Sequence, residues 1–73
     1  MSDSVGSEYV GATRHQIETM VLIHKCELRQ IDALLPTLLQ PEIVAMYSRR
    51  RQMLLDAITD LERTLREMPH ADA

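Results

Sequence analysis

The sequence predicts an all-α fold: an antiparallel two-helix hairpin that packs like a coiled coil. Two segments each repeat apolar residues at alternating steps of four and three, the spacing of a helix that packs along its length. A short stretch between Pro36 and Pro41 separates them, and helices joined by so short a connection usually lie side by side. The chain also has no Phe and no Trp but many Leu and Ile, which favours packed helices over a sheet.

A few residues near the start of the chain set the limits of the first helix. Residues 1–12 contain several Ser and Gly and are expected to form a flexible arm. Thr13 and Gln16 have the spacing of a capping box, in which each side chain bonds to the backbone N–H of the other residue. Pro36 lacks an N–H and disfavours helical geometry in the residue before it. We therefore expect the first helix over about residues 13–35.

The second helix has a proline at each limit. Pro41 suits the first helical position, and Glu42 beside it complements the positive end of the helix dipole. Another proline ends the apolar pattern near the end of the chain. We therefore expect the second helix over about residues 41–68, so that residues 13–68 form one hairpin and residues 69–73 form a tail.

The apolar pattern defines one seam on each helix, meaning the line of residues that faces the other helix. One polar residue interrupts each seam, His24 in the first helix and Arg51 in the second. When the hairpin is folded about its connector, Glu27 lies opposite Arg50, an ion pair of the kind that sets the alignment of two helices. The seam residues are Ile17, Val21, His24, Leu28, Ile31, Leu35 and Leu38, and then Val44, Tyr47, Arg51, Leu54, Ile58, Leu61, Leu65 and Met68.

A second apolar stripe beside the seam predicts a partner. A two-helix hairpin buries one stripe per helix, and a contiguous apolar patch left outside usually marks an interaction site. Methionine side chains repack easily against different helices, which suits such a surface. We expect either a helical partner protein or a second copy, which would complete a four-helix bundle, to cover it. The expected partner-binding residues are Met20, Ile23, Leu34, Ile43, Met46 and Met53.

The sequence predicts no enzyme, cofactor site or metal site. His24 and Cys26 are two residues apart and point to different sides of a helix, and no two histidines are four residues apart. Cys26 has no neighbours that would orient it as a nucleophile, and the chain has no glycine-rich phosphate loop.

Charge and hydropathy narrow the range of possible partners and of cellular locations. Acidic residues outnumber basic ones by 11 to 8, and this net negative charge does not favour binding to the phosphate groups of nucleic acids. Arg49, Arg50 and Arg51 lie 100° apart around a helix, so they cannot form one basic stripe. No apolar run is long enough to cross a membrane, and the start of the chain does not resemble a signal peptide. Together with a single cysteine, this predicts a cytoplasmic protein.

These features disfavour nucleic acid as a partner, but one alternative remains open. A homodimeric four-helix bundle could present basic residues from both copies to RNA or DNA, as a plasmid copy-number regulator does with RNA loops. In that alternative the protein would be a regulator that binds RNA or DNA, whereas in the first interpretation it is an adaptor that binds another protein.

The overall pattern resembles a known family of hairpin proteins. Its features are the chain length, the polar arm, two amphipathic helices, and a second helix that opens with Pro41-Glu42 and continues with Tyr47, Gln52, Leu55, Ala57 and Ile58. With these features, residues 13–66 resemble the small helical co-chaperones of type III secretion systems, which hold the needle subunit in the cytosol. The resemblance implies a non-enzymatic protein that pairs with a second helical chaperone and masks an amphipathic secretion substrate.

Overall fold

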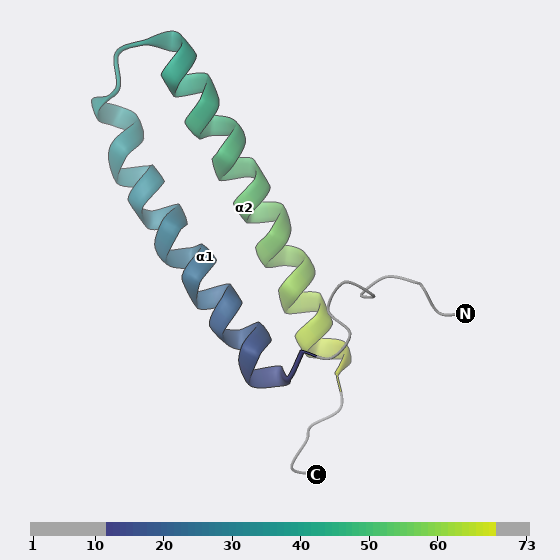
Figure 1. Cartoon of the computed structure of the whole chain (residues 1–73). Helices are drawn as coiled ribbons and strands as arrows, with labels where there is room; N and C mark the ends of the chain where they lie inside the picture. The colour runs from purple at the N-terminus through teal and green to yellow at the C-terminus, as the bar shows by residue number, and fades with distance from the viewer. Residues whose placement is uncertain (1–11, 69–73) are drawn as a thin grey trace.

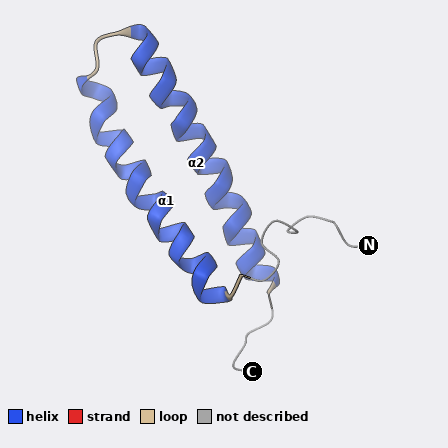
Figure 2. Cartoon of the chain, in the orientation of Figure 1, coloured by secondary structure: helices blue, strands red, loops and turns tan. Residues whose placement is uncertain are grey.

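The structure, a computed structural model, describes residues 12–68 and shows two helices packed side by side (Figure 1). Helix α1 is Arg14–Leu34, a 3₁₀ turn η2 is Leu35–Thr37, and helix α2 is Pro41–Glu67. The helices are antiparallel, with the connector at one end and the start of α1 beside the end of α2 at the other, and the described residues contain no strand (Figure 2). The all-α hairpin predicted from the sequence is confirmed.

The observed helix limits lie within one residue of the expected ones at each end. The expected arm and tail lie outside the described residues, with one exception. Ala12 was assigned to the arm, but it is half-buried and packs against the hydrophobic core.

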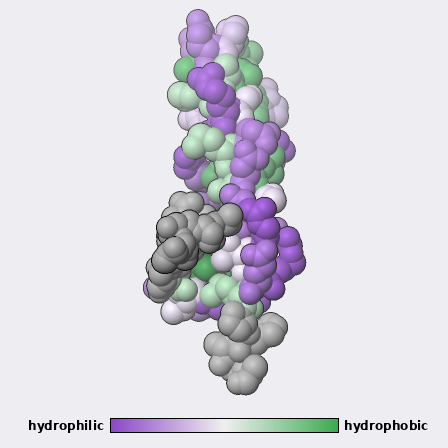
Figure 3. Space-filling model, turned by 90° about the vertical axis from the view of Figure 1, so that its right-hand side faces the viewer, coloured by the Kyte–Doolittle hydropathy of each residue, from purple (hydrophilic) through white to green (hydrophobic). Residues whose placement is uncertain are grey.

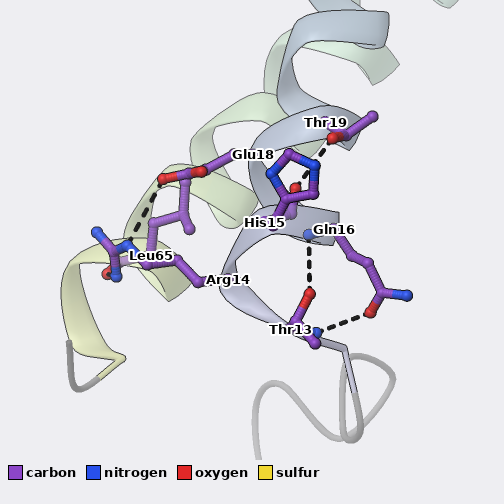
Figure 4. A network of polar contacts seen from close by, with 7 residues as sticks. All are labelled: Thr13, Arg14, His15, Gln16, Glu18, Thr19 and Leu65. Carbon is purple, nitrogen blue, oxygen red and sulfur yellow. Dashed lines mark hydrogen bonds and ion pairs between the residues drawn. The ribbon is translucent and has the colours of Figure 1, made fainter. Parts of the chain in front are cut away.

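The expected capping box starts α1. Thr13 Oγ1 accepts a hydrogen bond from the backbone N–H of Gln16 at 3.1 Å, and Gln16 Oε1 accepts one from the N–H of Thr13 at 2.8 Å (Figure 4). Beside it, Arg14 Nη1 donates to the carbonyl oxygen of Leu65 at 2.9 Å. That carbonyl lies in the last turn of α2, where backbone acceptors lack helical partners, so Arg14 joins the start of one helix to the end of the other.

The connector ends α1 and begins α2 in the way that the positions of its two prolines predict. After Leu34 the chain tightens into the 3₁₀ turn that contains Pro36, and Thr37 Oγ1 donates to the carbonyl of Leu34 at 2.6 Å. Pro41 occupies the first position of α2 and Gln40 is its N-cap residue, with no side-chain hydrogen bond at the cap. The start of α2 therefore depends on proline geometry rather than on a capping side chain.

The core follows the two seams. Every seam residue is buried or half-buried, and Ile17 and Leu61 are each only 1% exposed. The densest cluster lies toward the open end of the hairpin, whereas Ile31 is the only fully buried described residue of α1 beyond Val21. The connector half of the hairpin is therefore less well covered. The fully buried residues are Ile17, Val21, Ile31, Leu54, Ile58 and Leu61.

We predict that Thr13→Ala lowers the free energy of unfolding by about 1 kcal/mol, because it removes the capping bond at the start of α1. Thr59→Ala is the matched control, since Thr59 is exposed in the interior of α2 and bonds only to the carbonyl of Leu55. Urea unfolding followed by circular dichroism measures both. Equal effects of the two substitutions would show that the capping box does not stabilise the hairpin.

Candidate protein-interaction surface

Helical geometry places the expected partner-binding residues on one broad side of the hairpin. Successive residues turn by 100°, so Met20, Ile23 and Leu34 lie on the same side of α1 as Glu27. By the same spacing, Ile43, Met46 and Met53 lie on the same side of α2 as Arg50. Because Glu27 and Arg50 are in contact, the two sides form one continuous surface. We call this surface the apolar face, and its six apolar residues are Met20, Ile23, Leu34, Ile43, Met46 and Met53.

The six residues differ in how far they are available to a partner. Ile23 and Met53 are 58% and 60% exposed, and Met46 is 46% exposed. Met20, Leu34 and Ile43 are half-buried, and Met20 packs against the core cluster. Figure 3, which views the molecule from the α2 side, shows hydrophobic residues exposed among hydrophilic ones. Half of the expected set is thus open to solvent, and the other half also packs within the hairpin.

An ion pair lies in the middle of the apolar face. Arg50 Nε donates to Glu27 Oε2 at 2.7 Å, and Arg50 Nη2 donates to Glu27 Oε1 at 3.1 Å. Two parallel bonds of this kind fix the relative orientation of the two side chains, in addition to the attraction between their charges. The hydrogen bond from Arg50 lowers the pKa of Glu27, and the hydrogen bond to Glu27 raises the pKa of Arg50. The pair is the cross-helix contact expected from the sequence.

The opposite side of the hairpin is charged, and we call it the charged face. There Arg51 Nε donates to Asp32 Oδ1 at 2.6 Å, and Lys25 Nζ lies 3.1 Å from Glu62 Oε2. Both pairs join α1 to α2. The seam residue Arg51 is half-buried, and its guanidinium reaches out to this face.

The three consecutive arginines therefore have three different environments. Arg50 lies on the apolar face and Arg51 on the charged face, each in an ion pair across the helices. Arg49 is exposed and forms no ion pair with the residues that the structure describes. One free guanidinium does not make a phosphate-binding patch.

The other polar seam residue, His24, has an unsatisfied atom. Its side chain is half-buried, and its Nδ1 is buried without a hydrogen-bond partner among residues 12–68. A buried polar atom without a partner lowers stability, so His24 weakens the seam at this point.

Two strongly exposed apolar residues lie outside the set expected from the sequence. Leu22 is 64% exposed on the outer side of α1, and Leu39 in the connector is 91% exposed. Leu22 is one of six α1 residues that line a shallow hollow in the surface. The signal was present in the sequence, because Leu22 fits neither the seam nor the stripe beside it. The hollow is lined by Thr19, Leu22, Ile23, Cys26, Glu27 and Gln30.

Within residues 12–68, no group of three or more His, Cys, Asp and Glu side chains could hold a metal ion. Neither described helix combines the length and the apolar character needed to cross a membrane.

Comparison with protein-family models, curated protein sequences and solved structures found no match to this chain. Inferences about function therefore depend on the two faces described above.

The Glu27–Arg50 pair should make stability depend on pH in a defined direction. Because Arg50 lowers the pKa of Glu27 in the folded chain, the pair stabilises the hairpin above the ordinary value of 4.5. This contribution is lost as the pH falls through the lowered pKa. We therefore predict that Glu27→Gln reduces the free energy of unfolding at pH 7, and that its difference from wild type shrinks as the pH falls below 4.5.

Urea titrations at a series of pH values measure this difference. Repeating them in an Arg50→Ala background is the control, since Glu27→Gln should have little effect once the arginine is gone. A difference that stays constant from pH 7 to strongly acidic pH would mean that the pair does not contribute through its charge.

We predict that His24→Leu raises the free energy of unfolding by about 1 kcal/mol, because it replaces an unsatisfied polar atom in the seam with an apolar side chain. His15→Leu is the control, because His15 is exposed on the same helix. Thermal unfolding at pH 8 measures both variants. A loss of stability in His24→Leu would show that the imidazole has a favourable contact in solution.

Proposed function

We propose that this hairpin is a non-enzymatic protein–protein interaction module that masks an amphipathic helix of a partner. The exposure of Ile23, Met46 and Met53 on one side of a hairpin whose seams are already filled supports this most directly. These side chains leave about half of their surface open to solvent. Burying a fully exposed aliphatic side chain contributes about 1.5 to 3 kcal/mol, so a partner that covers the open half of all three gains part of that amount from each.

The shape of the apolar face suits helices as partners. Its six apolar residues lie on stripes with helical steps of three and four, which also include Glu27, Gln30 and Arg50, and amphipathic helices dock onto such surfaces with anchors at the same spacing. Two of the three exposed anchors are methionines, whose flexible side chains adapt to different partners. The poorly covered connector half of the core would also gain burial when a partner docks there.

The likeness to type III secretion co-chaperones leads to a more specific proposal. In that role the hairpin would pair with a helical chaperone and hold a secretion substrate until export. Cytoplasmic action fits this proposal, because Cys26, the only cysteine of the chain, is an exposed free thiol, and thiols stay reduced there.

Nucleic acid fits the surfaces less well than protein does. On the charged face the cations Lys25 and Arg51 are paired with carboxylates. A groove that binds phosphates needs several free cations on one side, and the arginine triplet offers only Arg49 among the described residues. We therefore propose a protein partner.

We predict that Met46→Asp combined with Met53→Asp abolishes binding at the apolar face and leaves much of the helix content intact. An anilinonaphthalene dye at low protein concentration reports exposed apolar surface, and a designed amphipathic helical peptide should displace it from wild type. Ser48→Asp with Thr59→Asp is the matched control, since it adds the same charge to exposed positions of α2 away from this face. Dye and peptide binding that survive in the Met46 and Met53 variant would place the binding surface elsewhere.

A further inference from the structure

We infer that the apolar face binds a second copy of this chain, with the two connectors at the same end of a four-helix bundle. This inference rests on the proposed function, because it names the partner of the same face. It follows from the size of the face, the symmetry of a homodimer, and the position of the Glu27–Arg50 pair.

The area of the apolar face suits a second hairpin as the binding partner better than a single helix. Two helices of 21 and 27 residues, each about 10 Å wide and about 30 to 40 Å long, offer a broad side of roughly 600 to 800 Å². A stable interface typically buries about 800 Å² on each partner, so the whole side is needed. One helix lying between α1 and α2 would leave the outer parts of Ile23 and Met53 uncovered. A second hairpin covers both rows of exposed side chains.

Two packings of the apolar face on itself have two-fold symmetry. When the two-fold axis runs along the helices, the connectors lie at the same end and α1 packs on α2 of the other copy. When the axis runs across the helices, the connectors lie at opposite ends and each helix packs on its own equivalent. Both packings make all neighbouring helices antiparallel, so helix dipoles do not distinguish them.

The ion pair distinguishes the two packings. Glu27 and Arg50 lie at the same level of the hairpin because they are in contact. With the connectors together, Glu27 of one copy therefore lies over Arg50 of the other, and the four charges alternate in sign. With the connectors apart and the axis at this level, Glu27 lies over Glu27 and Arg50 over Arg50, and like charges repel. Sliding the copies to avoid this contact would place the charges against apolar side chains, which is also unfavourable.

Four of the six apolar residues are matched in the arrangement that the charges favour. Counting from the ion pair along each helix places Ile23 at the level of Met53 and Leu34 at the level of Ile43. With the connectors together, each of these residues therefore lies over an apolar residue of the other copy. Complementary charges at the centre and apolar contacts on both sides make this packing self-complementary.

A subunit-exchange experiment tests the inference. Glu27→Arg with Arg50→Glu swaps the two charges and keeps the pair within each chain. We expect this variant and wild type each to form dimers by sedimentation equilibrium. We expect mixed dimers, measured by native mass spectrometry, to be at least roughly tenfold less stable than either homodimer, because they place like charges face to face. Mixed dimers that exceed the statistical proportion would show the opposite packing and overturn the inference.

A distance measurement tests the same packing without changing the charges. With Cys26→Ser as background, a spin label at Gln40→Cys reports the separation of the two connectors, and Gln40 is exposed with no side-chain hydrogen bond at the cap. The inferred packing gives about 20 Å or less, the width of two helices, whereas with opposite connectors the two labels lie about 30 Å apart, because Gln40 is about 15 Å along α2 from the level of Arg50. A label at Glu67→Cys, at the other end of the hairpin, should also give the short distance.

Failure of this inference is distinguishable from failure of the proposed function. A chain that stays monomeric at all concentrations, yet binds the dye and the helical peptide through Met46 and Met53, overturns the second copy and leaves the proposed function standing. A chain whose dye binding ignores both methionines overturns the proposed function as well.

Discussion

A layer of only two helices has a single internal seam, and the other features of this hairpin follow from that constraint. Each helix can turn one line of side chains toward the other, and the residues on these lines are the ones that become fully buried. All further apolar residues must stay on the outside or pack at the edge of the seam. The outer apolar side chains are therefore a consequence of the architecture, and three of the exposed ones, Ile23, Met46 and Met53, lie together on one broad side.

Charged residues set the alignment of the helices from both sides of the seam. Arg50 contacts Glu27 on the apolar face, while Arg51 contacts Asp32 on the charged face. A shift of one helix turn would break the two-bond contact between Arg50 and Glu27, which lie at nearly the same level of the hairpin. Exposed ion pairs stabilise a fold only weakly, so their main effect here is on alignment rather than on total stability.

The sequence was sufficient for the features that depend on local chemistry and on helical period. Thr13 and Gln16 form the capping box, Pro36 and Pro41 limit the connector, and the contact between Glu27 and Arg50 agrees with the seam register. Each of these follows from a spacing or from a proline that leaves few alternatives. The partner-binding role of the outer residues is a prediction of a different kind, because it depends on a molecule that the sequence does not contain.

Other features could not be read from the sequence because they depend on side-chain reach. Lys25 and Glu62 lie at clearly different levels of the hairpin, yet they meet because side chains in a helix lean toward its N-terminus and these two helices run in opposite directions. The degree of exposure, by contrast, follows the helical period. Met20 lies nearer to the seam around the helix than Ile23 does, and Met20 packs against the core cluster whereas Ile23 is 58% exposed.

The position of the Glu27–Arg50 pair suggests why a binding surface would contain charges at all. A wholly apolar face would accept another helix in any register and either direction, since dispersion and burial have no preferred orientation. A paired carboxylate and guanidinium at its centre favours partners that bring matching charges to that point and disfavours those that cover it with apolar groups. Polar groups at otherwise apolar helix interfaces commonly trade some affinity for a unique alignment. On this face the pair that aligns α1 with α2 would also determine which way a second layer of helices can pack.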